Sequence, residues 1–288
     1  MSTVIIGCGD VGRRIAVCLA KQREPSDNVS AFVRSDDSLI ASAKLGISTS
    51  KLDLDAALTD MSVCRDADIY YTVPPQKIGI TDERSRALQA AFDGQQIRPR
   101  KVVLISTTGV YGDCGGAWVT EESPTQPATE RGKRRLDSEA SWLLWGQQNA
   151  VSVVILRVPG IYAFSRLPRE RLRKRIPVVA AEECGFTNRI HADDLANVNV
   201  TAMRVGVAGE IYNVTDGAPS KITTYLQEAA RILGMESLPE ISMQQAQRQL
   251  SSGMLSYLGE SRKISNQKML NELGVKLKYP DFKIGIKN

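Results

Sequence analysis

Six residues near the start of the chain have the spacing of a phosphate-binding turn. Residues 7–12 read Gly-Cys-Gly-Asp-Val-Gly, between the apolar residues 3–6 and a helical stretch. There the first glycine permits a tight turn, the second lets backbone approach a pyrophosphate, and the third allows close helix–strand packing. The N-terminus of the helix adds free N–H donors and a positive dipole end. The sequence therefore predicts a dinucleotide site, and the alternative is a turn that only joins strand to helix. The residues assigned to it are Gly7, Cys8, Gly9, Asp10, Val11 and Gly12.

The end of the second expected strand indicates which dinucleotide is bound. Sites for NAD(H) carry an acidic residue there, which binds the 2′-hydroxyl of the ribose. In this chain Arg34 stands at that position, and the first acidic residue is Asp36. A guanidinium group suits a 2′-phosphate in charge and bidentate geometry, and Ser35 can add a hydrogen bond. The sequence therefore predicts a preference for NADP(H). NAD(H) is the alternative if Arg34 is an ordinary surface residue.

Composition and charge narrow the class of protein. The 288 residues include 37 Lys and Arg, 32 Asp and Glu, 5 Cys and 1 His. The net charge of +5 fits a protein that handles anionic small molecules rather than nucleic acid. Scattered cysteines without a Cys-x-x-Cys spacing argue against a metal site and favour a reducing compartment. Because the chain shows no signal-peptide pattern and no apolar run of membrane-span length, we expect a cytoplasmic protein.

Apolar segments alternate with helical ones through the first two thirds of the chain. Strands are expected at residues 3–6, 29–33, 47–51, 69–73, 102–106, 151–156 and 209–215. Helices are expected at residues 11–21, 38–45, 82–92 and 133–148, and another, capped near Asp193, is expected to run to Arg204. This alternation is typical of an α/β Rossmann-type fold, a doubly wound parallel sheet. We expect residues 1–158 and about 189–215 to form the NAD(P)-binding domain, and about 159–188 and 216–288 a smaller substrate-binding lobe.

Four segments of the chain resemble one protein family. Besides the glycine turn they are residues 105–112, 156–163 and 189–196, which read ISTTGVYG, LRVPGIYA and RIHADDLA. In order and spacing they are similar to the extended short-chain dehydrogenase/reductases, and in particular to the NAD-dependent epimerase/dehydratase family. The resemblance covers nearly the whole chain. It implies a Ser or Thr that steadies the substrate oxygen, a Tyr that acts as acid and base, and a Lys four residues later that binds the nicotinamide ribose.

Only part of this catalytic set is present. Thr107 falls at the Ser/Thr position, whereas Arg131 and Arg135 stand where the Tyr and the Lys are expected. Arg131 cannot act as a proton shuttle at pH 7, because an arginine pKa is about 12.5 or higher. Arg135 can still offer charge and hydrogen bonds to the ribose. The chain therefore resembles an atypical branch that lacks the Tyr-x-x-x-Lys pair. The further residues that the resemblance assigns to the cofactor are Val73, Pro74, Arg135 and Pro159.

A site without the usual tyrosine needs another proton donor. Tyr111 lies in the matched Val-Tyr-Gly segment, near the expected substrate, and is the first candidate. The alternative is that its ring packs the loop, just as Thr107 has an alternative role in packing the strand end. Tyr162, Cys114 and His191 are the other titratable candidates. Thr107 and Tyr111 are thus the expected catalytic residues, and no metal is expected.

A basic run indicates the charge of the substrate. Residues 166–175 include six Arg or Lys side chains. They suit a phosphorylated or carboxylated substrate, such as a nucleotide sugar. A patch for an acidic partner or a solvated helix face are the alternatives, and the lack of interleaved aromatic residues argues against single-stranded nucleic acid.

Two functions fit these features. The first is an NAD(P)-dependent oxidoreductase, epimerase or dehydratase that acts on an anionic small molecule. The second is a non-catalytic protein that senses NADP(H), which the loss of the Tyr/Lys pair favours. The resemblance also implies a homodimer through the helices near residues 82–92 and 133–148. Because one fold hosts many chemistries, fold alone does not decide between the two functions.

Overall fold

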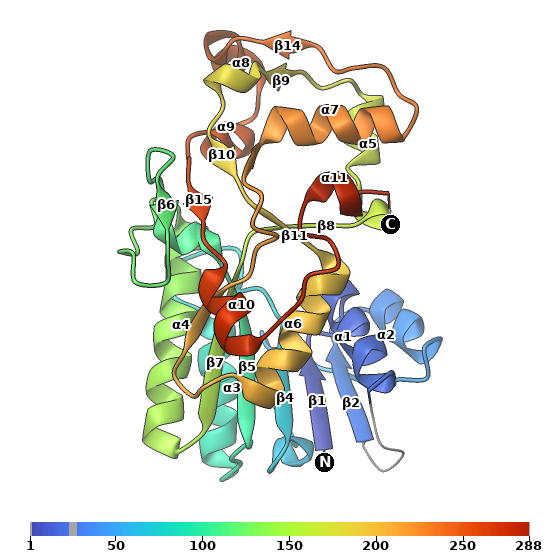
Figure 1. Cartoon of the computed structure of the whole chain (residues 1–288). Helices are drawn as coiled ribbons and strands as arrows, with labels where there is room; N and C mark the ends of the chain where they lie inside the picture. The colour runs from blue at the N-terminus through green and yellow to red at the C-terminus, as the bar shows by residue number, and fades with distance from the viewer. Residues whose placement is uncertain (1, 23–27, 288) are drawn as a thin grey trace.

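The computed structural model describes residues 2–22 and 28–287, which fold around a parallel β-sheet. The sheet has seven strands in the order β3-β2-β1-β4-β5-β7-β12 (Figure 1). Its strands are β1 (Ser2–Ile6), β2 (Asn28–Val33), β3 (Ser48–Lys51), β4 (Asp68–Tyr71), β5 (Lys101–Thr107), β7 (Ser152–Val158) and β12 (Ile211–Asn213). The strand order reverses direction between β1 and β4, as in a doubly wound Rossmann-type sheet, so the predicted fold class is confirmed.

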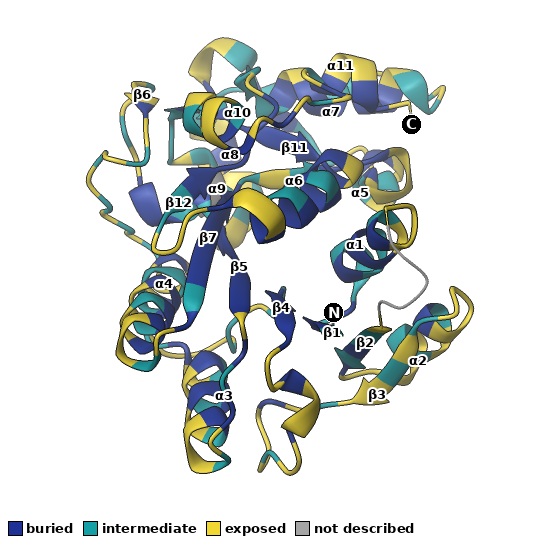
Figure 2. Ribbon diagram, turned by 60° about the horizontal axis from the view of Figure 1, so that its bottom comes forward, coloured by how far each residue is buried: buried dark blue, intermediate teal, exposed yellow. Residues whose placement is uncertain are grey.

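Helices cover both faces of this sheet. The larger ones are α1 (Asp10–Ala20), α2 (Asp36–Ala43), α3 (Glu83–Gly94), α4 (Glu130–Asn149) and α6 (Ala192–Val205). Residues of β1 alternate between the faces: Ile5 shares a buried cluster with Ile15 of α1. Val4 and Ile6 share another with Leu88 of α3. Figure 2 shows the result, with buried strands between helices whose outer sides are exposed. Each expected strand and helix of the sheet region is present, with shifted ends.

The beginning of α6 differs from the prediction. Asp193 is expected to cap this helix, but its N-cap is His191, whose ring Nδ1 accepts a hydrogen bond from the backbone N–H of Asp193 at 3.2 Å. The neighbouring Asp194 accepts bonds from the backbone N–H groups of Lys278 and Tyr279, at 2.9 and 2.8 Å. Asp193 and Asp194 directly follow the cap region in the sequence. Asp194 does not cap the helix; it binds a segment near the C-terminus and holds that segment against α6.

The remaining elements lie mostly above the carboxyl ends of the strands in Figure 1. Two-stranded pairs join β8 to β11, β9 to β14, β10 to β13 and β6 to β15. These short strands are β6 (Trp118–Val119), β8 (Gly160–Tyr162), β9 (Val178–Val179), β10 (Phe186–Thr187), β11 (Arg189–His191), β13 (Ser220–Lys221), β14 (Glu240–Ile241) and β15 (Lys263–Ile264). The helices are α5 (Arg169–Arg173), α7 (Ile222–Ile232), α8 (Met243–Gln249), α9 (Ser252–Leu258), α10 (Gln267–Leu273) and α11 (Phe282–Gly285). Met269 and Leu273 of α10 pack in the core of the sheet, on the side of α6. Among residues 2–22 and 28–287, none of the helices has the length and hydropathy required to cross a membrane.

A buried carboxyl group lies just beyond β12. Asp216 is 3% exposed, and its Oδ1 accepts a hydrogen bond from the backbone N–H of Ala218 at 3.1 Å. Its Oδ2 makes no hydrogen bond within the described part of the chain. Burial raises the pKa of Asp216 from 3.8 to about 8, so the carboxyl group is mainly protonated at neutral pH.

We expect the unfolding free energy of Asp216→Asn to rise relative to that of the wild type as the pH increases from about 4 to about 8. Across this range the unfolded wild-type chain loses the Asp216 proton while the native state keeps it, so wild-type stability falls. The asparagine variant lacks this titration, so the gap in unfolding free energy widens by up to about 1.4 kcal/mol per pH unit and levels off above pH 8. Urea unfolding of both proteins at several pH values measures it. A gap that does not change with pH would contradict a neutral Asp216.

Candidate functional site

The glycine turn between β1 and α1 has the geometry that its sequence predicts. Gly7 has φ +96°, and a Cβ there would lie 2.8 Å from a methyl group of Val73. A Cβ on Gly12 would lie 3.1 Å from a methyl group of Ile5, so this glycine lets α1 approach β1 closely. At Gly9 the nearest described atom to such a Cβ is 3.9 Å away. The first and third glycines are therefore required by the fold, whereas the second leaves open space beside the backbone.

The N-terminus of α1 lacks a side-chain cap among the described residues. Its N-cap is Gly9, whereas side chains of Ser35, Asp82 and Thr129 cap α2, α3 and α4. The N–H groups of the first turn of α1 are therefore available to an anion, and the helix dipole favours negative charge there. The negative charge of Asp10 repels an anion at this helix end. Its carboxylate is paired with Arg166 at 2.7 Å, which brings the basic run to the turn.

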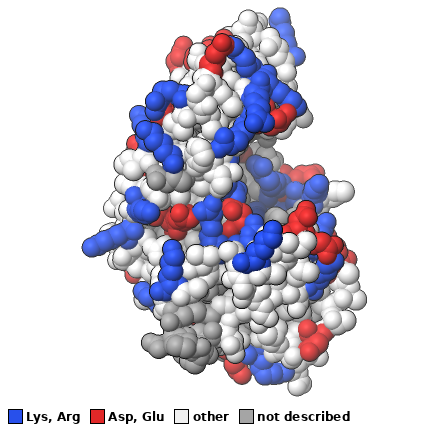
Figure 3. All heavy atoms as spheres, turned by 90° about the vertical axis from the view of Figure 1, so that its right-hand side faces the viewer, with Lys and Arg blue, Asp and Glu red and all other residues white. Residues whose placement is uncertain are grey.

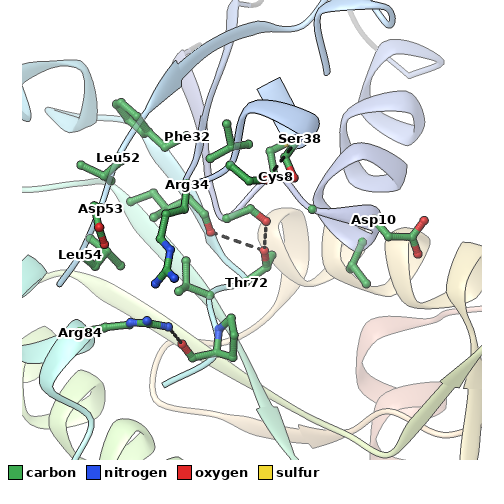
Figure 4. A pocket seen from close by; sticks show the side chains of 18 of the residues that line it. Cys8, Asp10, Phe32, Arg34, Ser38, Leu52, Asp53, Leu54, Thr72 and Arg84 are labelled. Carbon is green, nitrogen blue, oxygen red and sulfur yellow. Dashed lines mark hydrogen bonds between the residues drawn. The ribbon is translucent and has the colours of Figure 1, made fainter. Parts of the chain in front are cut away.

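A cavity of about 670 Å³ opens beside this turn, and we call it the glycine-turn cavity. Figure 4 shows its walls, which come from the ends of β1, β2 and β4 and from the segment after β3. Its lining includes the predicted residues Gly7, Cys8, Gly9, Asp10, Val11, Arg34, Ser35, Val73 and Pro74. Arg166 of the basic run also lines it, and so do Ser38, Asp53, Lys77 and Arg84, which the sequence did not single out.

The far end of the glycine-turn cavity is basic. Arg34 is 62% exposed, and its Nη1 lies 3.0 Å from Oδ2 of Asp55. Arg84 binds the same carboxylate with its Nε 2.6 Å from Oδ1, and this hydrogen bond holds the pKa of Asp55 below its usual range. The Asp55 carboxylate thus binds two guanidinium groups, those of Arg34 and Arg84. Both arginines line the cavity, on the side where the 2′-phosphate is predicted.

A smaller pocket of about 80 Å³ is lined by Thr107, the residue predicted to bind the substrate oxygen, and we call it the Thr107 pocket. It is lined by Thr107, Arg131 and Pro159 among the residues singled out in the sequence. The Thr107 hydroxyl accepts a hydrogen bond from the backbone N–H of Gly109 at 3.2 Å. Across the pocket, Glu260 is paired with Arg262 at 2.7 Å. Among the described residues that line this pocket there is no Tyr, Lys, His or Cys.

Arg135 lies between the two cavities without contributing to the described lining of either. Its guanidinium donates to the carbonyl oxygens of Ile105 at 2.9 Å and Val73 at 3.4 Å. Burial lowers the pKa of Arg135, but the group remains a cation. Arg135 therefore joins the carboxyl ends of β4 and β5, beside the place where the family resemblance puts the ribose.

Tyr111 is held in the interior rather than in a cavity wall. It is 1% exposed, its hydroxyl donates to Oδ1 of Asn213 at 2.9 Å, and it accepts from Nη1 of Arg157 at 2.9 Å. Burial raises its pKa. These surroundings favour the alternative in which Tyr111 packs its loop. Tyr162 is equally buried, with a raised pKa, and the ring of His191 caps α6.

The parallel sheet and the glycine turn together define a Rossmann-type fold. No protein-family model matches the chain. A conserved protein of unknown function from Silicibacter pomeroyi superposes with a TM-score of 0.85 at 27% identity, covering 99% of this chain and 96% of that one. A protein assigned as an NAD-dependent epimerase/dehydratase from Methylobacillus flagellatus superposes at 0.69, with 26% identity and 99% and 95% coverage.

Two dehydratases are also similar. The dTDP-glucose 4,6-dehydratase of Bacillus anthracis, solved with NAD, superposes with a TM-score of 0.79 at 16% identity, covering 100% of this chain and 94% of that one. The human dTDP-D-glucose 4,6-dehydratase is 24% identical over 146 residues, which span 48% of this chain but only 42% of the human protein. The resemblance predicted from the four motifs is thereby confirmed: the chain has the fold of the NAD-dependent epimerase/dehydratase family.

Proposed function

We propose that this protein binds NADP(H) in the glycine-turn cavity and transforms an anionic small molecule, as an oxidoreductase or epimerase with a non-standard active site. The observation that carries the proposal is the open space at Gly9, next to an α1 N-terminus without a side-chain cap. A pyrophosphate placed there accepts hydrogen bonds from backbone N–H groups. The similar B. anthracis dehydratase was solved with NAD, and its dTDP-glucose substrate class supports a nucleotide-sugar-like ligand.

The residues of the cavity fit this cofactor. The α1 N-terminus would hold the pyrophosphate, and Arg34 with Ser35 would hold the 2′-phosphate. The bound nicotinamide supplies hydride transfer, and the protein supplies orientation and the handling of the proton. The Thr107 hydroxyl would steady the substrate oxygen, while Arg131 would stabilise negative charge as it develops there. Because Tyr111 is buried with both of its hydrogen bonds made, water is the better proton donor.

A non-catalytic NADP(H) sensor is the second candidate. It is favoured by the Thr107 pocket, whose described lining offers arginines and threonines where the family places a proton-shuttling tyrosine. A sensor requires only the cofactor site, which the proposal shares.

A titration with NADPH, followed by an activity screen, tests the proposal. Cofactor fluorescence should show saturable binding, and nicotinamide absorbance should change when a panel of anionic metabolites is added with the cofactor. Tight binding without turnover on any metabolite would favour the sensor. A protein that binds neither NADPH nor NADH would refute both functions.

We expect Arg34→Asp to weaken NADPH binding by roughly ten- to a hundredfold, because a charge-assisted bond to the 2′-phosphate is replaced by repulsion. NADH lacks this phosphate, so its affinity should change by less than about fivefold. Calorimetric titration of both cofactors measures the ratio. Lys44→Asp is the matched control, because Lys44 is an exposed cation outside the lining of the cavity. Equal losses for the two cofactors would remove the NADP(H) assignment.

A further inference from the structure

A third cavity lies among the elements above the sheet, and we call it the apolar cavity. Its volume is about 260 Å³. Its walls come from β9, α7 and α9, and they include Val178, Val179, Ile222, Leu226, Met254 and Leu258. Among the described residues that line it, the only charged ones are Arg131 and Arg171. An apolar cavity with two cations is suited to an anion that carries a hydrocarbon body.

Arg171 is a cation that makes few strong polar contacts. Its Nε is buried and makes no hydrogen bond within the described part of the chain. Its other contacts are weak: Nη1 lies 3.6 Å from the sulfur of Met254, and Nη2 lies 3.5 Å from the carbonyl oxygen of Pro177. None of the ion pairs among the described residues includes Arg171. Burial also lowers its pKa. The Arg171 side chain is half-buried, and its buried Nε without a hydrogen-bond partner is costly to the fold, which favours a role in binding.

The neighbouring basic side chains make a useful contrast. Lys174 pairs with Glu170 at 3.3 Å, and Arg175 pairs with Glu236. Lys and Arg side chains gather over the upper part of the face in Figure 3, where α5 lies, and there water screens them. Arg171 alone, among the described basic residues of α5, lines a cavity rather than facing solvent in this way. Within the basic run, Arg166 thus lines the glycine-turn cavity and Arg171 lines the apolar cavity, whereas Lys174 and Arg175 are exposed.

Arg131 lines both the apolar cavity and the Thr107 pocket, so the two spaces are neighbours at this side chain. A molecule in the apolar cavity therefore lies next to the pocket where the proposed function puts the reacting oxygen. The size of the space is also informative. Pockets for drug-sized ligands measure about 300–1,000 Å³, so this cavity fits a smaller body than a nucleoside diphosphate.

We infer that the apolar cavity is the substrate subsite, and that it takes a small carboxylic acid with an apolar body. The carboxylate pairs with the guanidinium group of Arg171, the hydrocarbon part contacts Val178 and Leu226, and the reacting end lies toward Arg131 and Thr107. The inference rests on the proposed function for its chemistry, and among the anionic substrates proposed there it selects a small carboxylic acid in place of a nucleotide-sugar-like ligand.

Binding of model ligands tests the inference without knowledge of the true substrate. The probes are 4-phenylbutanoate, the uncharged 4-phenylbutan-1-ol with the same body, and glucuronate, a polar acid. We expect calorimetry to show that 4-phenylbutanoate binds at least tenfold more tightly than either of the others, because only it satisfies both the cation and the apolar walls. Equal affinity for the alcohol, a preference for glucuronate, or no binding of the phenyl acid would each overturn the inference.

Arg171→Met removes the guanidinium group and keeps an apolar side chain in the wall of the cavity. We expect it to weaken 4-phenylbutanoate binding by roughly tenfold or more. Without ligand, the variant should melt at a higher temperature than the wild type, because it loses a half-buried charge that has no ion-pair partner within the described part of the chain. The matched control is Arg173→Met, an exposed arginine of the same helix, which should leave binding unchanged. An unchanged affinity or a lower melting temperature in Arg171→Met would show that Arg171 serves the fold.

Different measurements test the inference and the proposed function, so the failure of one can be told from the failure of the other. The probes are titrated first without cofactor, and NADPH is titrated separately into wild type and Arg171→Met. NADPH affinity should be the same in both proteins, because Arg171 does not line the glycine-turn cavity. A wild type that binds the phenyl acid but no dinucleotide would refute the proposed function and leave the subsite standing. The reverse pattern would refute the subsite alone.

Discussion

Replacing Gly9 with valine is expected to abolish NADPH binding and to leave the protein folded. The backbone of Gly9 has φ −74° and ψ −152°, so it lies outside the left-handed region, with positive φ, that favours glycine. A new side chain would point into space where the nearest described atom is 3.9 Å from its Cβ. The valine would therefore fill the place of the pyrophosphate while meeting little of the protein itself.

The expected loss is more than roughly a hundredfold in affinity. Several charge-assisted hydrogen bonds from backbone N–H groups would be lost together, and each contributes about 1.5–3 kcal/mol. Fluorescence titration with NADPH measures the affinity, and circular dichroism checks the fold. Gly94→Val is the matched control, because a Cβ on Gly94, at the end of α3, also meets no described atom within 4 Å. Retained affinity in Gly9→Val would exclude the turn as the phosphate site.

The neighbouring glycine should behave differently. At Gly7 a Cβ would meet Val73 at 2.8 Å and the backbone has a positive φ, so a substitution there disturbs the fold itself. A loss of binding in a Gly7 variant would not distinguish a phosphate site from a damaged turn. This is why Gly9 is the informative position.

The sheet and the turn could be predicted from the sequence because their signals are local. A buried parallel strand is apolar along its whole length, as β5 is from Val102 to Ile105. The glycine spacing follows from contacts between residues less than ten positions apart, such as Gly12 with Ile5. Arg34 was predicted at the cavity because it directly follows a strand, and the carboxyl ends of parallel strands share one edge.

The rest of the site depends on residues that are distant in the sequence. Arg166 reaches Asp10 across 156 positions, and Arg84 meets the carboxylate of Asp55 across 29. No spacing rule predicts such pairs. Tyr111 shows the same limit: its motif places it near the substrate, but its hydroxyl is held by Arg157 and by Asn213, which is 102 positions away. The apolar cavity is also assembled from elements that only the tertiary fold brings together.

Arg157→Met is expected to destabilise the protein by about 3–5 kcal/mol, the cost of leaving a buried charge without its partner. Arg157 of β7 and Glu139 of α4 form an ion pair of 2.7 Å, with side chains only 5% and 2% exposed. Nε of Arg157 also donates to Oε1 of Glu139 at 3.2 Å, while Nη2 donates to Oε2, so the contact is bidentate. The methionine keeps the apolar stem but leaves the Glu139 carboxylate buried, with Ser106 as a remaining donor.

A second substitution shows whether charge or packing causes this loss. In Arg157→Met combined with Glu139→Gln, no buried charge remains, so most of the lost stability should return. Urea unfolding measures the free energies, and Arg98→Met is the control, because its ion pair with Asp93 is exposed and should contribute less than about 1 kcal/mol. If the double variant is no more stable than Arg157→Met, the loss comes from packing against Tyr111, whose ring lies 4.8 Å from the guanidinium carbon.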